Sequence, residues 1–394
     1  MSEDKASLYN GTFIIGFAFN FFMGFLFTNN ALYPLYVEYE GGGAAEIGLF
    51  MAAFAVSAGL CRPLTGLLVD WLGVRPILML GALSLSLPCL GYLFMLDHGL
   101  VFFSWLLRIV QGFGWGCHMT AFFTMAGQVA PAGRRNEAIA MYGMSGLASN
   151  MVGPVTGELL IDHFGMPAFF VMFLVMGAIA FVLIMQIPLP KRMETSAGLT
   201  LRGFYTVVFM PVFWLAFVLA MLHAVSYSSI SAFLAPIAKM RDIAMFSLFF
   251  TAFSISGVAI RLLGSHWGDR HGVVRILLPG YFLYVTGLLI LQITSSVMGI
   301  LLAGVICGIA HGLSFPAVTN LGYSLAPSAY RGTGVALVTG MMDAGNALSS
   351  FLLGQIGEVF GFYYLFGLAS LAPLMGALLL MWNQKKLLHK MRAP

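Results

Sequence analysis

Long apolar runs separated by short polar segments cover almost the whole chain. A helix needs about 20 mostly apolar residues to cross a hydrocarbon core of about 30 Å. Runs of that length recur from one end of the 394 residues to the other. We therefore expect twelve membrane-spanning helices, at residues 11–36, 47–69, 76–96, 100–128, 137–160, 166–188, 207–236, 244–264, 274–293, 298–325, 332–357 and 362–382.

Two polar interruptions carry the same charges at the same spacing. In RPLTGLLVDWLGVRPILMLG (62–81) and RLLGSHWGDRHGVVRILLPG (261–280), Arg62 matches Arg261 and Asp70 matches Asp269. A second pair of similar segments is APAGRRNEAIA (130–140) and APSAYRGTGVA (326–336). Each pair has equivalent places in two sets of six spans, and parallel repeats of this kind are one plan of membrane transporters.

This repetition divides the chain into two halves. We expect an N-terminal six-helix half at 1–190, a cytoplasmic linker at 191–206 and a C-terminal six-helix half at 207–394. The linker begins with the polar segment KRMETSAGLTLRG (191–203). The predicted fold class is an all-α membrane protein with twelve transmembrane helices in two pseudo-symmetric halves.

Composition and charge agree with this interpretation and give the orientation. The chain is 60% hydrophobic and 9% charged, whereas about a quarter of the residues in a soluble domain are charged. If the N-terminus is cytoplasmic, 16 of the 19 Lys and Arg residues lie on that side, as the positive-inside rule requires. The exceptions are Arg108 within a span and Lys239 and Arg241 outside. Both termini are thus expected in the cytoplasm, and the net charge of +4 reflects topology rather than a nucleic-acid partner.

No motif indicates an enzyme. The four cysteines lie within or at the edges of spans, and their spacing fits neither a disulfide framework nor a metal site. Nucleotide-binding loops, catalytic triads and metal-binding helices are absent from the sequence. The first span has no cleavage site after it and is expected to remain as a helix. We therefore expect no cofactor, no metal and no ATP hydrolysis on this chain.

The repeated loop resembles the best-known signature of the major facilitator superfamily, and the resemblance covers essentially the whole chain. The first copy reads Gly66-Leu-Leu-Val-Asp70-Trp-Leu-Gly73-Val-Arg75, with Trp71 where the family has a base. The resemblance implies a cytoplasmic gate in which the acid meets a neighbouring helix end and Arg, an attraction with a clear physical basis. The implied gating residues are Gly66, Asp70, Gly73, Arg75, Arg261, Asp269, Arg270 and Gly272.

Two further segments resemble signatures of the same superfamily. RIVQGFGWG (108–116) in the fourth span is similar to its Arg-x-x-Gln-Gly motif. Gly153-Pro154-x-x-Gly157 in the fifth span resembles the signature of its export branches, notably the drug–proton antiporters. Small residues at 146, 150, 153 and 157 form a face that another helix can approach closely, and Pro154 allows a bend. A simple packing kink is the alternative interpretation.

Only Arg108 and Asp343 place a charge well inside a span, so both are candidates for coupling. Many drug–proton antiporters that this chain resembles have an acid in the first or fourth span, which this chain lacks, so Asp343 is the best candidate for the proton carrier by elimination. Glu158 and Glu358 lie near outer span ends and are expected to face water. Three histidines at 118, 223 and 311 could titrate near neutral pH instead, or serve as hydrogen-bonded lining residues.

The superfamily resemblance implies that spans one, four, seven and ten line a central cavity. On these spans we expect the solute to contact Asn30, Trp115, His118, His223, Tyr227 and His311. Neutral hydrogen-bonding groups together with aromatic and Met side chains suit an amphiphilic or moderately apolar solute.

The predicted function is secondary active efflux of a small organic or drug-like solute, coupled to protons. Alternatives are a proton-coupled or exchange carrier of a small organic anion that uses Arg108, and a non-transporting receptor or scaffold on the same fold. Expected partners are the solute, protons and membrane lipid, with the chain acting as a monomer in a bacterial cytoplasmic membrane.

Overall fold

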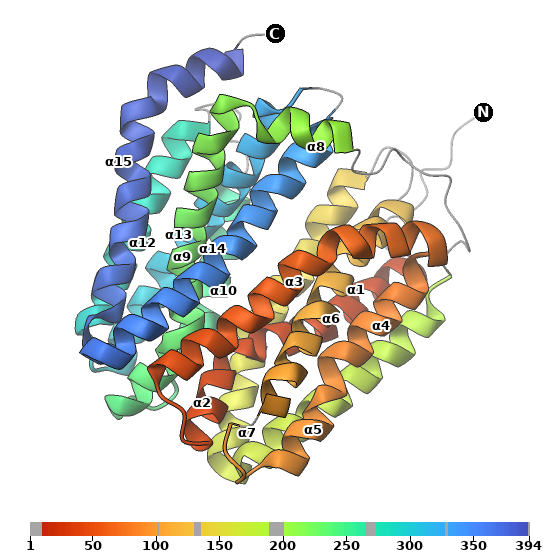
Figure 1. The fold of residues 1–394 in the computed structure, drawn as a ribbon, viewed down its shortest axis with the longest axis vertical. Coiled ribbons are helices and arrows are strands. Elements are labelled where there is room, and N and C mark those ends of the chain that lie inside the picture. The colour runs from red at the N-terminus through yellow and green to blue at the C-terminus, as the bar shows by residue number, and fades with distance from the viewer. Residues whose placement is uncertain are drawn as a thin grey trace. The chain divides into compact units, whose positions relative to one another are not determined.

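The computed structural model describes residues 10–100, 102–129, 135–188, 201–264, 273–327 and 330–392. This described part is helical, with short turns and no strand (Figure 1). The predicted gate residues Asp269, Arg270 and Gly272 lie outside the described residues, as does linker segment 191–200.

The N-terminal half contains seven α-helices and one 3₁₀ turn. They are α1 (Gly11–Thr28), η1 (Asn29–Leu32), α2 (Tyr33–Tyr39), α3 (Ala44–Leu72), α4 (Val74–Ser86), α5 (Pro88–Met95), α6 (Phe102–Val129) and α7 (Arg135–Gln186). The first predicted span is interrupted at Asn29, whose side-chain amide donates to the Phe25 carbonyl at 2.9 Å. Such local bonds compete with a regular helix, which explains the 3₁₀ turn.

The C-terminal half has a similar order of elements. They are α8 (Leu201–Val208), α9 (Pro211–Met240), α10 (Leu248–Leu263), α12 (Val273–Ile293), α13 (Val297–Leu325), α14 (Arg331–Phe360), η3 (Phe362–Tyr364) and α15 (Leu365–Arg392). Pro211 occupies the first turn of α9, where its missing N–H costs nothing. The seventh span therefore begins four residues later than its predicted start at 207.

Twelve transmembrane helices are confirmed as the architecture. Nine described segments are long and apolar enough to cross a membrane, and one of these, Met141–Gln186, holds two spans in its 46 residues. The remaining spans are α6, with 28 residues, and α10, with 16. The eighth span begins at Leu248 rather than 244, because Asp242 and Met245 adopt positive φ angles of 52° and 54° that interrupt a helix.

Helix contacts group the chain into two compact units. Unit 1 comprises Met1–Asn30 and Ser57–Gly198, and unit 2 comprises Ala31–Val56 and Leu199–Pro394. The segment Ala31–Val56 therefore groups with the C-terminal helices and not with the rest of the N-terminal half. A Cβ on Gly48 would lie 2.3 Å from the Ser350 carbonyl oxygen, so only glycine permits this approach between α3 and α14.

Glycine contacts also show the internal repeat. A Cβ on Gly81 would lie 3.0 Å from the Gly114 carbonyl oxygen, and one on Gly280 would lie 3.4 Å from that of Ala310. The first pair joins α4 to α6, and the second joins α12 to α13. Spans three and four therefore pack in the same way as spans nine and ten, through glycines at equivalent positions of the two repeats.

A further repeat is evident in the backbone. Gly165 has φ 77° and ψ 179°, and Gly361 has φ 76° and ψ 167°. The two glycines are as far apart in the sequence as the segments 130–140 and 326–336. Each glycine joins the last two spans of its half. This conformation is essentially restricted to glycine. The two halves thus share a turn that their sequences mark only with a Phe-Gly pair.

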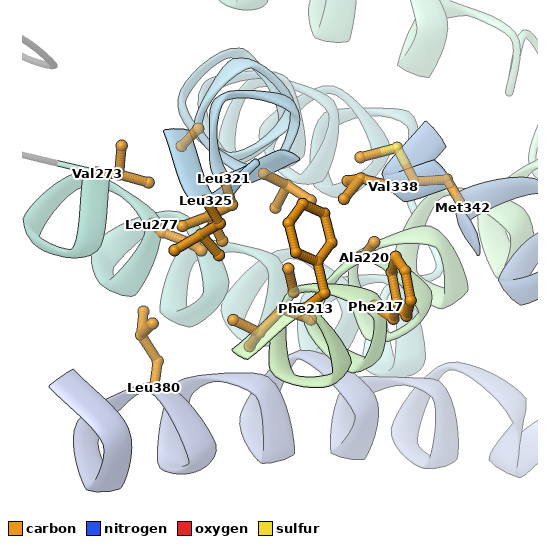
Figure 2. Close-up of a cluster of buried hydrophobic side chains, with 14 of the residues drawn as sticks. Phe213, Phe217, Ala220, Val273, Leu277, Leu321, Leu325, Val338, Met342 and Leu380 are labelled. Atoms are coloured by element: carbon orange, nitrogen blue, oxygen red, sulfur yellow. The ribbon is translucent and has the colours of Figure 1, made fainter. Parts of the chain in front are cut away.

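A buried apolar cluster joins α8, α9, α12, α13, α14 and α15 of unit 2 (Figure 2). Phe213, Phe217 and Ala220 of α9 lie against residues of α12, α13 and α14, with Leu380 contributed by α15. Within a bilayer such packing, rather than transfer from water, holds helices together. The other labelled members are Val273, Leu277, Leu321, Leu325, Val338 and Met342.

Replacing Gly361 by Ala tests the shared turn. Space is available, since a Cβ there would meet nothing within 4 Å, so the cost is conformational and of about 1–3 kcal/mol. We expect a lower unfolding midpoint for the purified protein in detergent. Gly143→Ala is the control, because Gly143 is helical and equally open, and Ala favours a helix by about 1 kcal/mol. Equal unfolding midpoints for the two variants would contradict the conclusion that this turn requires glycine at position 361.

Candidate functional site

Arg108 is buried in unit 1 among neutral amides. Its side chain on α6 is 1% exposed. Nη1 donates to Oε1 of Gln111 at 3.2 Å, and Nη2 donates to Oδ1 of Asn30. Gln111 in turn donates to the Leu85 carbonyl at 3.1 Å. The structure therefore joins Arg108, a predicted coupling residue, to Asn30, a predicted solute contact, and anchors both to α4.

Glu158 was expected to face water, and this expectation is wrong. The residue is 2% exposed. The predicted span ended at 160, but α7 continues regularly to Gly165, so Glu158 lies further from the helix end than expected. Asn150, two helical turns earlier, is also buried. This spacing on one face is the sequence signal that could have identified Glu158. Glu358, by contrast, is exposed, and its Oε2 accepts from the Ala45 N–H at 3.2 Å.

An aromatic stack contains two of the predicted solute contacts. Trp115 lies on Phe27 with ring centroids 3.8 Å apart and planes at 6°, and His118 stacks on Trp115 at 5.3 Å. Since residues three apart share a helix face, α6 presents both rings together. His118 is fully buried, and its Nε2 lies 3.1 Å from Oδ1 of Asn20. Asn20 also donates to Oγ of Ser145 at 2.7 Å, which links α1, α6 and α7.

In unit 2 the structure brings together the other three predicted solute contacts. His223 and Tyr227 lie one turn apart on α9, and His311 of α13 is 5.5 Å from His223 and 5.7 Å from Tyr227 between ring centroids. The hydroxyl of Tyr284 on α12 lies 2.8 Å from Nδ1 of His311. Phe253 of α10 is 5.2 Å from the same imidazole. Sequence analysis missed Tyr284 and Phe253, because aromatic residues occur in nearly every span and give no distinguishing signal.

The segment of the export signature packs closely against α1. A Cβ on Gly153 would lie 2.5 Å from Oγ1 of Thr28, and one on Gly24 would lie 2.7 Å from Oγ of Ser149. Both contacts leave no room for a larger side chain. Gly157 and Pro154 are buried in the same stretch of α7.

Most of the described gate residues lie at or near the ends of helices. Asp70 is exposed near the end of α3, and Gly73 turns the chain with φ 87°. Arg75 donates from Nη2 to the carbonyl of Ile187, directly beyond the end of α7. A cation at that position satisfies carbonyls that the helix leaves free. Gly66 lies within α3 with open space around it.

The second-half equivalent of Arg62 lines a cavity. Arg261, at the end of α10, borders a space of about 280 Å³ together with Asn320 of α13. The other lining residues are apolar or glycine: Ile260, Gly264, Val273, Ile276, Gly312, Leu313, Pro316 and Ala317. Among the described residues, no cluster of three His, Cys, Asp or Glu side chains could hold a metal ion.

Asp343 is half-buried on α14, a helix that packs tightly against α9. Oγ of Ser228 lies 2.7 Å from Oγ of Ser350 and donates to the Asn346 carbonyl at 3.0 Å. A Cβ on Gly345 would lie 2.8 Å from the Met221 carbonyl oxygen. Asp343 and His223 are therefore carried by two neighbouring helices of the same unit.

Comparison with known proteins identifies the family. The family model described as Major Facilitator Superfamily matches residues 11–244 and 216–390. The multi-drug resistance efflux pump PmrA of Streptococcus pneumoniae is 24% identical, covering 89% of this chain and 86% of the pump. The multidrug resistance protein MdtG of Serratia proteamaculans is 26% identical, covering 97% of this chain and 94% of MdtG.

Solved structures show the same fold at low identity. The nucleoside transporter NupG superposes with a TM-score of 0.79 at 12% identity, over 94% of this chain and 99% of NupG. A peptide transporter POT gives 0.81 at 13% identity, over 96% and 95%. Because the family model matches nearly the whole chain, the repeated loops and the twelve helices have one explanation: this chain belongs to the major facilitator superfamily of membrane transporters.

Proposed function

We propose that this transporter exports small, amphiphilic, drug-like solutes from the bacterial cytoplasm in exchange for protons. The aromatic and imidazole surfaces on α1, α6, α9 and α13 carry this proposal. Relatives named as multidrug efflux or resistance proteins, which cover most of the chain, support the export direction.

The solute class follows from the groups that these surfaces offer. In unit 1 they are the rings of Phe27, Trp115 and His118, and in unit 2 those of His223, Tyr227 and His311. Stacked rings provide a large apolar area with defined edges, and imidazole and phenol add neutral hydrogen bonds. Such surfaces suit planar, moderately apolar molecules of several shapes better than a small, strongly charged metabolite.

Proton exchange is assigned to Asp343. A carboxylic acid in a spanning helix is neutral more readily than in water and ionises more readily when water reaches it. A helix that alternates between these two surroundings can load a proton on one side of the membrane and release it on the other. Arg108, held by Asn30 and Gln111, supplies a fixed positive charge in the other half.

Transport measured in inverted membrane vesicles tests the proposal as a whole. We expect uptake of amphiphilic fluorescent dyes when a proton gradient is imposed, and its collapse when an ionophore removes the gradient. A panel that also includes small organic anions separates the two solute classes. Gradient-driven uptake of the anions alone would refute the proposed solute class.

Asp343→Asn tests the coupling assignment. The amide imitates the protonated acid, so proton-driven uptake should fall to the level of vesicles without the protein, while solute-for-solute exchange continues. Asp162→Asn is the matched control, since Asp162 is exposed between the fifth and sixth spans. Full gradient-driven uptake by the Asp343 variant would exclude this residue as the carrier.

Gly153→Val tests the close contact between α1 and α7. The added methyl groups would collide with Thr28, and overpacking of this kind costs about 1–3 kcal/mol. We expect loss of uptake with near-normal insertion, measured by transport and by the amount of protein in the membrane. Gly143→Val, on an open face of α7, should retain uptake. Wild-type activity of both variants would show that this contact is not needed for transport.

A further inference from the structure

His223 is buried without a hydrogen-bond partner for either ring nitrogen. The side chain is 2% exposed, and no described residue bonds to Nδ1 or Nε2. A neutral imidazole carries one N–H donor and one lone pair, and burying both without partners is costly. Packing alone would favour an aromatic ring without nitrogens at this position, such as Phe. The retained nitrogens therefore indicate an occupant that binds to them.

His311 lies directly beside this unsatisfied imidazole. The two ring planes are 26° apart with centroids separated by 5.5 Å. Nδ1 of His311 pairs with the Tyr284 hydroxyl at 2.8 Å. Tyr284 also lies edge-on to His223, at 5.5 Å between centroids and 75° between planes. A proton needs no additional volume, so it can bind to a nitrogen of His223 without displacing these neighbouring rings.

The groups around the pair come from four helices. Arg261 is the charged residue whose field reaches His311 among the described groups. The Tyr281 hydroxyl is not available as a donor to the pair, because it donates to the Leu219 carbonyl at 2.7 Å. The titratable and charged groups facing the pair are Tyr227 on α9, Arg261 on α10, Tyr281 and Tyr284 on α12, and Cys307 on α13. None of these is a carboxylate.

A cavity at the end of α10 begins next to His311 along α13. Gly312 and Leu313, which follow His311 on α13, line the cavity of about 280 Å³ that Arg261 borders. By the charge asymmetry of the loops, this end of the helix is cytoplasmic. The positive charge of Arg261 opposes a second positive charge nearby and so favours release of a proton toward this side.

We propose that His223 and His311 form a single proton-binding site that holds at most one proton and releases it through the cavity beside Arg261. The proton adds from water to an imidazole lone pair and returns to water from the same nitrogen, so no other reactant is needed. Two imidazolium ions at this separation in a low dielectric would repel strongly, which limits the pair to one proton. The site rests on the proposed proton exchange and adds a second carrier to Asp343.

The test is a titration of the ¹⁵N-histidine-labelled full-length protein, observed by NMR across roughly pH 5 to 8, where an unperturbed imidazole changes charge. Comparison with either His223→Gln or His311→Gln assigns the NMR signals of the pair. Only one of these two variants therefore needs to be purified. We expect a single proton to be taken up by the two rings together, and the remaining histidine of each variant to titrate at a different pH from the wild type. His163→Gln, at an exposed residue, should leave the pair's signals unchanged.

Two results would overturn the proposal: independent uptake of a full proton by each ring, or signals from both rings that do not change across this range. Transport gives the second measurement. His223→Gln should lose proton-driven uptake in vesicles, whereas His163→Gln should retain it. If the wild type takes up one shared proton but shows no proton-driven transport, the proposed function fails and the site stands. If transport is proton-driven but the rings do not titrate, the proposed site fails and the proposed function stands.

Discussion

Close approach of helix backbones is the constraint on which the other features of this structure depend. Inside a bilayer, apolar side chains gain nothing by leaving lipid for protein, so helices are held by packing and by hydrogen bonds between them. Gly153 against Thr28, Gly81 against Gly114 and Gly48 against Ser350 are such contacts. Each one fixes the rotation of a helix about its own axis. That rotation decides which residues of α6, α9 and α13 point toward their neighbours and are available for function.

The two halves use this common framework to hold different chemistry. Unit 1 keeps a permanent charge, Arg108, within a network of amides that includes Gln111 and Asn30. Unit 2 keeps imidazoles and phenols, which can be neutral or charged, in the corresponding layer of helices. Trp115 and His311 occupy equivalent positions in the repeat, so a single residue difference places an inert ring in one half and a titratable ring in the other. At this position the duplicated chain therefore carries different chemistry in its two halves.

Much of the architecture could be predicted from the sequence, because span length and loop charge follow directly from the bilayer. The repeated loop and Arg108 could also be identified in the sequence, since charges are conspicuous in an apolar chain. Glu158 was misjudged because sequence locates a helix end only to within about 2–4 residues. The pairing of His223 with His311 was not accessible, since contact between α9 and α13 depends on helix rotation. The shared turn at Gly165 and Gly361 was missed because a single Phe-Gly pair in each half is too weak a signal to predict a backbone conformation.

The grouping of Ala31–Val56 with the C-terminal helices has a consequence for synthesis. These residues leave the ribosome early, yet the residues that α3 packs against through Gly48 belong to α14, near the end of the chain. Until α14 is inserted, this segment has only lipid or transient neighbours for its glycine surface. The N-terminal half therefore cannot complete its packing on its own. A ribosome that stops before residue 331 would release a protein whose early helices are in the membrane but whose unit 2 is unfinished, and membrane quality-control proteases could recognise that exposed surface.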